Sequence, residues 1–207
     1  MIKIAKHLLP LFIVQFFTWL GLFALWIYAT PVITRYIFGA LDAQSSAFEN
    51  GTAWVGICFA LYSTLAALLV FIIPKVEKIT GKEKLHAIAL IAGAVGLLLI
   101  YFIKNKYMLF LSFAFIGIAW SSISTIPYSI VSSIAPEESM TNYFAVFNFS
   151  VVIPQVTAAF LFGYINHHFL NGNSIYIMPI GSFCMLIAGI VMFFVKYKVY
   201  QPELIDD

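Results

Sequence analysis

Long runs without a charged residue are the feature that most constrains this chain. No Asp, Glu, Lys or Arg occurs in residues 8–34, 51–74, 85–103 or 107–136. A fifth uncharged run, residues 139–195, is interrupted by the turn formers of "NHHFLNGNS", so we count it as two segments. A membrane-spanning helix needs about 20 apolar residues, and each of the six segments is long enough. The sequence therefore predicts six transmembrane helices.

Composition agrees with a lipid environment. The chain of 207 residues is 62% hydrophobic and 10% charged, whereas soluble domains have about 25% charged residues. We expect an all-α membrane protein with one six-span domain, residues 1–207, in contact with the bilayer. No basic cluster points to nucleic acid. The expected spans are Leu8–Tyr36, Gly51–Ile73, Leu85–Ile103, Tyr107–Ile134, Asn142–Ile165 and Ser174–Val195.

Lysine and arginine residues predict the orientation, because positive charges concentrate in cytoplasmic loops. With an inner N-terminus, eight lysines lie inside, against Arg35, Lys104 and Lys106 outside. We therefore expect both termini in the cytoplasm of a multi-pass protein in the cell (inner) membrane. The first span is too long for a signal peptide, and no A-x-A-like cleavage site ends it. The eight inner lysines are Lys3, Lys6, Lys75, Lys78, Lys82, Lys84, Lys196 and Lys198.

Polar side chains in the first span share one face. At about 100° per residue, Gln15, Trp19 and Trp26 lie within about 40° of one another. Thr18 adds a hydroxyl group beside them. Polar groups inside a span are costly in lipid, so they are expected to face protein or a water-filled cavity.

Three further spans also carry polar groups. In the fifth span, Asn148 and Gln155 are seven residues apart and therefore stack on the same side, with the helix-bending Pro154 between them. The third and sixth spans lack such groups in their bodies, so we expect them to be peripheral. The second span carries Trp54, Tyr62, Ser63 and Thr64. The fourth span carries Ser121, Ser124, Thr125, Tyr128 and Ser132, which the helical period places on one face.

Less specific interpretations compete with a cavity. Hydroxyl groups in membrane helices often bond their own backbone, and tryptophans often mark the membrane interface. Cys58 and Cys184 lie in apolar runs and are interpreted as small buried side chains rather than as a disulfide. His167 and His168 are interpreted as loop residues rather than metal ligands. No reactive constellation is visible, so we do not expect an enzyme.

The pattern of six spans resembles one half of a transporter of the major facilitator superfamily. "QFFTWLGLFALWIYATPVITRYIFG" (Gln15–Gly39) looks like the seventh span of the glycoside/sugar:cation symporter branch, and "ENGTAWVGICFALYSTLAALLVFIIP" (Glu49–Pro74) looks like the eighth. "IAWSSISTIPYSIVSSIAPEESMTNYFAVFNFSVVIPQ" (Ile118–Gln155) is similar to the tenth and eleventh. The loop "PKVEKITGKEK" resembles a weakened form of the superfamily's charged inter-helix motif.

The resemblance implies transport of a sugar, an oligosaccharide such as sucrose or maltose, by alternating access and coupled to protons. It implies no cofactor beyond a proton gradient. It covers only the C-terminal half of a twelve-span carrier and places the proton-coupling carboxylate in the missing half. Accordingly, no span here contains Asp or Glu, and Glu137 and Glu138 are predicted to start a helix. From face and resemblance, the candidate cavity residues are Gln15, Thr18, Trp19, Trp26, Trp120, Ser124, Tyr128, Asn148 and Gln155.

Other interpretations remain open at this level. One alternative is a truncated fragment without activity. Another is a six-span subunit that acts only with a second copy or with a separately encoded N-terminal half. An unrelated six-span membrane enzyme and a structural scaffold are further alternatives. The scaffold would not need polar faces on four of its six helices.

Overall fold

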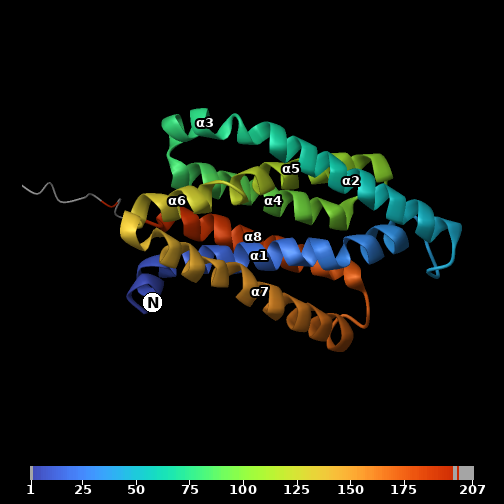
Figure 1. Cartoon of the computed structure of the whole chain (residues 1–207). Helices are drawn as coiled ribbons and strands as arrows, with labels where there is room; N and C mark the ends of the chain where they lie inside the picture. The colour runs from blue at the N-terminus through green and yellow to red at the C-terminus, as the bar shows by residue number, and fades with distance from the viewer. Residues whose placement is uncertain (1, 198–199, 201–207) are drawn as a thin grey trace, which may run out of the picture.

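The computed structural model describes residues 2–197 and 200, and these form a bundle of helices (Figure 1). Six helical segments in this part of the chain are long and apolar enough to cross a membrane, which confirms the predicted number. The α-helices are α1 (Ile2–Tyr36), α2 (Ser46–Val70), α3 (Ile73–Thr80), α4 (Lys82–Phe102), α5 (Leu109–Ile123), α6 (Ile126–Ile134), α7 (Met140–His168) and α8 (Ile177–Phe194). Short 3-10 turns are η1 (Lys106–Met108), η2 (Glu137–Ser139) and η3 (Ser174–Tyr176).

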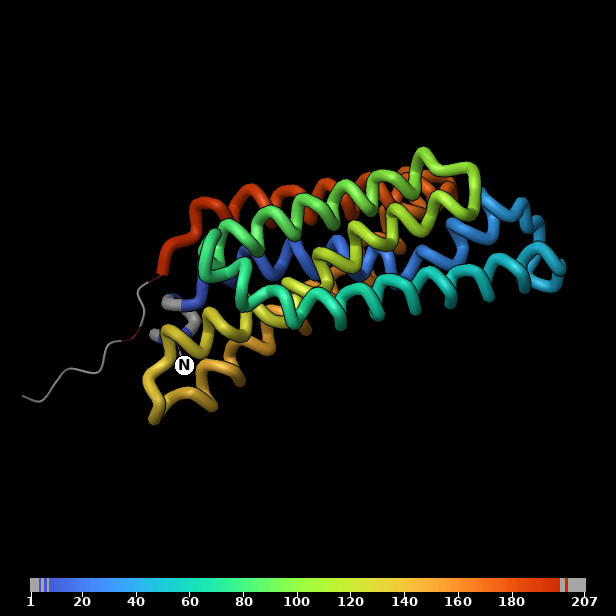
Figure 2. Tube along the Cα trace, turned by 90° about the horizontal axis from the view of Figure 1, so that it is seen from above, coloured from blue at the N-terminus to red at the C-terminus, as the bar shows by residue number. Residues whose placement is uncertain are grey.

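Helix α1 lies at the centre of the bundle. It packs against α8, α7 and α2, while α4 packs against α8 and α5. Figure 2 shows α4 in green and α8 in red along one edge and α2 in cyan along the opposite edge. The first turn of α1 and the last turn of α8 lie at the same end, which we call the terminal end (Figure 1).

Within this chain alone, the third and sixth spans, which we expect to be peripheral, are not the least buried. In the most apolar window of each span, 50% of the residues of α4 and of α8 are buried, against 22% for α2 and 28% for α7. Helix α4 buries its small residues against α5 and α8, and α8 buries its small residues against α4 and α1. Helices α2 and α7 are the ones that leave most of their surface uncovered.

Small residues bring α4 close to its neighbours. A Cβ atom at Gly96 would lie 2.7 Å from the carbonyl oxygen of Ser112, so only glycine permits this approach. The Ser112 hydroxyl group donates a hydrogen bond to the Gly96 carbonyl oxygen (2.6 Å). On the other side, the Ser182 hydroxyl group of α8 donates to the Ala94 carbonyl oxygen (2.7 Å). Such inter-helix hydrogen bonds and close contacts hold helices together where the hydrophobic effect cannot.

The fourth span is not the single helix that the sequence predicted. Helix α5 ends at Ile123, and α6 begins at Ile126 with a proline at its N-terminus, Pro127. Pro127 has no N–H group for the carbonyl oxygen of Ile123, so the helical hydrogen bonding is interrupted there. Thr125, with φ −125° and ψ −56°, lies in the break. Residues after the break do not continue the register of α5, on which the single polar face was predicted.

Two loops were predicted with different success. Asn171 (φ 49°) and Gly172 (φ 75°) adopt left-handed backbone conformations after α7, as expected for the turn formers there. His167 and His168 lie in the last turn of α7, so their interpretation as loop residues is wrong. Glu137 and Glu138 begin η2, which leads directly into α7, so the predicted helix start is confirmed.

Candidate functional site

Three indole rings from two helices meet inside the bundle. Trp19 and Trp26 of α1 lie edge to face with ring centroids 6.0 Å apart, because residues seven apart share one face of a helix. Trp120 of α5 lies edge to face with both, at 6.2 Å from Trp19 and 5.6 Å from Trp26. We call these three residues the indole cluster. The Trp26 and Trp120 side chains are only partly buried, so part of each ring is open to contact.

Other aromatic rings extend the indole cluster. The ring centroid of Phe23, one turn after Trp19, lies 5.3 Å from that of Trp26. The ring centroid of Tyr62 in α2 lies 6.3 Å from that of Trp120. The cluster therefore links α1, α2 and α5, which are three of the four spans on which the sequence predicted a cavity.

Polar groups beside the indole cluster lack hydrogen-bond partners. Gln15 is 1% exposed, and neither its amide nitrogen nor its amide oxygen bonds to another described residue. The Thr18 hydroxyl group and the Trp19 Nε1 atom are also buried and unpartnered within the described residues. Burying an unpaired amide or hydroxyl group costs roughly 1–3 kcal/mol each. One face of α1 therefore carries three side chains whose hydrogen-bonding capacity is unused.

The predicted residues of the fourth span lie further from this arrangement. The Ser124 side chain is exposed, and its hydroxyl group donates to the Trp120 carbonyl oxygen (2.8 Å), one turn earlier in its own helix. Tyr128 of α6 is 39% exposed and packs against Phe147 and Phe144 of α7, with ring centroids 5.3 Å and 6.3 Å away. Tyr128 therefore joins α6 to α7 rather than extending the indole cluster.

The two amides of α7 lie on its uncovered surface. The Asn148 and Gln155 side chains are both exposed and form no hydrogen bond with another described residue. Their common side of α7 agrees with the predicted spacing. The structure does not bring them against the indole cluster, so any role with it depends on what covers α7.

Two polar residues in the bundle were missed from the sequence. Ser150 of α7 is 4% exposed, and its hydroxyl group has no partner in the described part of the chain. His86 of α4 is 0% exposed, and its Nδ1 atom forms a hydrogen bond of 2.7 Å with Ser122 Oγ of α5. His86 is the second residue of the uncharged run 85–103 and was not among the predicted site residues. Lys84 lies only two residues before His86, so nothing local in the sequence predicts that His86 is completely buried.

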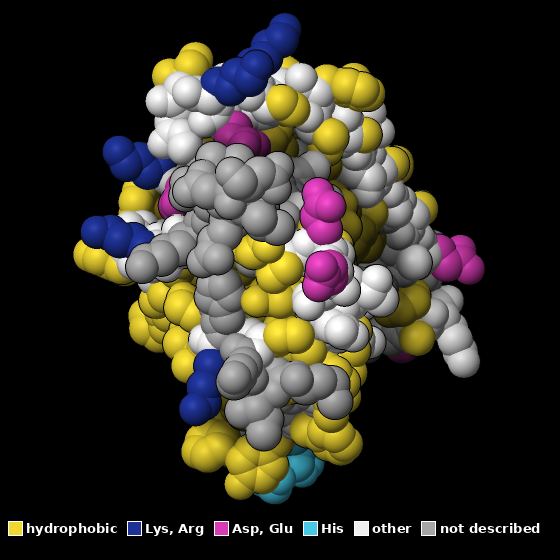
Figure 3. All heavy atoms as spheres, turned by 60° about the vertical axis from the view of Figure 1, so that its left-hand side comes forward, with side chains coloured by type: hydrophobic (Ala, Val, Ile, Leu, Met, Phe, Trp, Pro, Cys, Tyr) yellow, Lys and Arg dark blue, Asp and Glu magenta, His cyan; other side chains and the backbone are white. Residues whose placement is uncertain are grey.

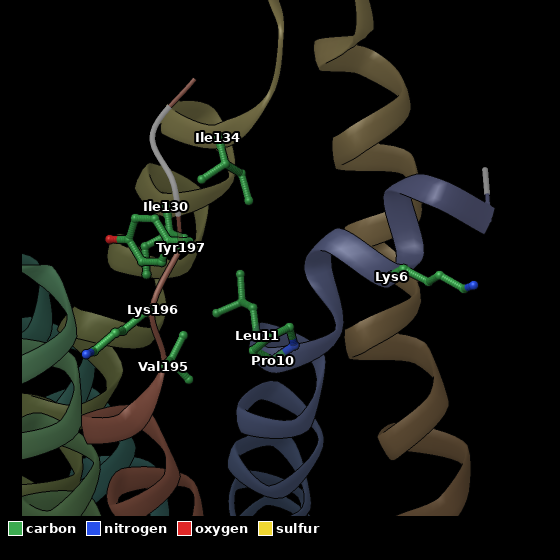
Figure 4. Close-up of a pocket in the computed structure, with 8 residues that line it drawn as sticks. All are labelled: Lys6, Pro10, Leu11, Ile130, Ile134, Val195, Lys196 and Tyr197. Atoms are coloured by element: carbon green, nitrogen blue, oxygen red, sulfur yellow. The ribbon is translucent and has the colours of Figure 1, made fainter. Parts of the chain in front are cut away.

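A hollow of about 320 Å³ lies at the terminal end, away from the indole cluster (Figure 4). Its walls are mainly aliphatic, from α1, α6 and the segment after α8. The Lys6 and Lys196 side chains border it, but their ammonium groups point away from it in Figure 4. The hollow therefore offers few polar groups to a sugar.

Charged side chains of both signs gather at the terminal end (Figure 3). The Lys82 ammonium group lies 3.9 Å from a Glu77 carboxylate oxygen and donates a hydrogen bond to the Ser129 carbonyl oxygen (3.3 Å). Burial raises the pKa of Tyr197, and the neighbouring carboxylates of Glu83 and Glu77 raise it further. These contacts connect α3, α4, α6 and the segment after α8.

Comparison with known proteins does not identify a function for this chain. No protein-family model matches the chain. A search of curated protein sequences finds no match either.

Proposed function

We propose that this chain is a sugar-binding half of a membrane transporter of the major facilitator type. Its substrate is a neutral oligosaccharide such as sucrose or maltose, carried across the cell (inner) membrane with protons. The single observation that supports this proposal most is the indole cluster beside the unpartnered polar groups of α1. Two kinds of group needed for a sugar, aromatic faces and free hydrogen-bonding groups, lie next to each other there.

The chemistry of these residues favours a neutral, polyhydroxylated ligand. The apolar face of a sugar ring packs on an indole, while its hydroxyl groups need both donors and acceptors. Gln15 supplies both a donor and an acceptor, and Thr18 and Trp19 supply further donors. No Asp, Glu, Lys or Arg lies between Lys6 and Arg35 in α1 or anywhere in α5. A charged ligand would find no counter-charge on these helices.

The carrier needs a second half to close around the sugar. Helices α2 and α7 are the least buried spans. Helix α2 exposes mostly small or polar residues, whereas α7 exposes Asn148 and Gln155 together with large apolar side chains such as Phe160. A Cβ atom at Gly56 of α2 or at Gly163 of α7 would meet nothing within 4 Å. We propose that this surface, including Asn148 and Gln155, faces an N-terminal six-span half or a second copy of the chain. Alternating access then arises from the two halves rocking around a midplane site.

Binding of sugars to the chain in lipid nanodiscs tests the proposal. Equilibrium dialysis with radiolabelled sucrose, maltose and a glucuronide should show binding of a neutral disaccharide in preference to the charged sugar. Trp120→Leu should weaken this binding about fivefold, because an aromatic contact contributes about 1 kcal/mol and 1.4 kcal/mol is a factor of ten.

Trp54→Leu is the matched control. Trp54 lies away from the indole cluster, where its Nε1 atom donates to the Lys106 carbonyl oxygen (3.0 Å). Its loss should leave sugar binding unchanged. Equal weakening by both substitutions, or binding of no neutral sugar by the unaltered chain, would contradict the proposal. Uptake into vesicles with and without a pH gradient then tests transport and its coupling to protons.

A further inference from the structure

His86 occupies an unusual position for an ionisable side chain. It is the fifth residue of α4, one turn inside the span, and it is 0% exposed. Its Nδ1 atom is bonded to Ser122 Oγ at 2.7 Å, and either group can donate, depending on the tautomer. Its Nε2 atom is buried and has no partner among the described residues. An imidazolium ion needs an acceptor at both nitrogen atoms, so this surrounding holds only the neutral ring.

Helix α4 holds both sides of the break in the fourth span. On one side, His86 bonds Ser122, two residues before the break begins at Ser124. On the other side, Lys82, one turn earlier in α4, donates to the carbonyl oxygen of Ser129 in α6 (3.3 Å). A hollow of about 210 Å³, lined by Ser121 and Ser122 among others, adjoins the first contact. Ser122 therefore contacts both this hollow and the imidazole ring.

No charged group compensates a proton on His86 in the conformation described. Helix α5 has no titratable residue, α6 has only Tyr128, and α8 has only Cys184. The remaining neighbours carry titratable groups mainly near their ends: Lys75, Glu77 and Lys78 on α3, Lys82, Glu83, Lys84 and Tyr101 on α4, and Lys6, Tyr28, Arg35 and Tyr36 on α1. Among the described residues, none of these groups forms an ion pair or a hydrogen bond with His86.

We propose that His86 is a proton-binding residue of the carrier. It is neutral while sealed between α4 and α5, and it takes a proton at Nε2 when movement at the α5–α6 break admits water. A proton that binds only the open form shifts the population toward that form as the pH falls. This inference rests on the proposed transport function, for which it supplies a proton site in a half without an intramembrane carboxylate.

Thiol labelling in nanodiscs, without any sugar, tests the inference. In a Cys58→Ala/Cys184→Ala background, Ser121→Cys places a thiol at a buried position (3% exposed) beside Ser122. Its rate of reaction with a small water-soluble thiol reagent is divided by the rate for Ser124→Cys, an exposed neighbour, which corrects for the thiolate fraction. The ratio should rise as the pH falls from 8 to 5, by up to about tenfold per pH unit, because one proton is taken up.

Two histidine variants decide whether His86 causes the rise. His86→Gln should make the ratio independent of pH, whereas His168→Gln, at the exposed end of α7, should leave the rise unchanged. A flat ratio in the unaltered background, or the same rise in His86→Gln, overturns the inference. Because no sugar is present, this outcome is independent of whether the chain carries sugar.

A second measurement avoids any substitution at His86. In the Ser121→Cys background, ¹⁵N-histidine spectra of the folded chain can be assigned with His7→Gln, His167→Gln and His168→Gln variants. The imidazolium signal of His86 should appear over the same pH range as the rise in the labelling ratio. A ring that stays neutral over that range would also overturn the inference.

Discussion

Trp19 of α1 and Trp120 of α5 lie edge to face with ring centroids 6.2 Å apart, although 101 positions separate them in the sequence. Trp19 is 8% exposed, whereas Trp120 is only partly buried. The contact fixes one face of α1 against α5 and leaves part of the Trp120 ring open. The same pair of side chains therefore contributes both to packing and to the proposed sugar site.

A double-mutant cycle should detect this contact. Trp19→Leu and Trp120→Leu together should cost less than the sum of the two single changes, with a coupling energy of about 0.5–1.5 kcal/mol. The free energy of unfolding in mixed micelles is the measurement. The pair Trp19→Leu and Trp54→Leu should be additive, since Trp54 instead packs against Tyr107 and Phe110. Additivity in both cycles would show that the edge-to-face geometry contributes nothing measurable.

Gln15→Leu should separate stability from binding. The unpartnered Gln15 amide is nearly completely buried, so replacing it with a side chain of similar size should raise the free energy of unfolding by about 1 kcal/mol. The same substitution removes a donor and an acceptor from the proposed site and should weaken sugar binding. Thermal denaturation and equilibrium dialysis measure the two effects on one sample. A loss of stability would mean that the amide has a partner when the chain is in a bilayer.

Gly96→Ala should destabilise the bundle, whereas Gly163→Ala should not. A Cβ atom at Gly96 would lie 2.7 Å from the Ser112 carbonyl oxygen, so α4 and α5 must move apart, at a cost of about 1–3 kcal/mol. At Gly163 a Cβ atom meets nothing within 4 Å, and alanine favours a helix by up to about 1 kcal/mol. Thermal denaturation of both variants provides the comparison. Equal midpoints would show that the α4–α5 contact is looser than described.

The correct predictions from the sequence rest mostly on local patterns, namely uncharged runs and the helical period. The number of spans follows from uncharged runs, and the shared face of Gln15, Trp19 and Trp26 follows from the helical period alone. The break at Thr125 was missed because the uncharged run of the fourth span continues through Pro127 and was counted as one helix. The helical period and the break before Pro127 both depend on hydrogen bonds between residues a few positions apart.

Tertiary packing explains the remaining differences. Nothing local to "LHAIAL" shows that α5 and its Ser122 will cover His86 completely. Composition also could not show that half of the residues in the most apolar parts of α4 and α8 are buried, whereas most of those in α2 and α7 are not. The placement of Asn148 and Gln155 against a sugar stays a prediction, since it depends on a second half.

Tyr197→Phe should change how stability depends on alkaline pH. Burial raises the pKa of Tyr197 above its ordinary value of 10.0, and the carboxylates of Glu83 and Glu77 add to the effect. The folded chain therefore keeps this proton more tightly than the unfolded chain does. The stabilisation is fully present below about pH 10 and is lost as the pH rises above that value. Unaltered chain should lose more thermal stability between pH 9 and pH 11 than Tyr197→Phe does, with Glu83→Gln between the two because one of the neighbouring charges is gone. Identical alkaline losses in all three would show that Tyr197 is not held against these carboxylates.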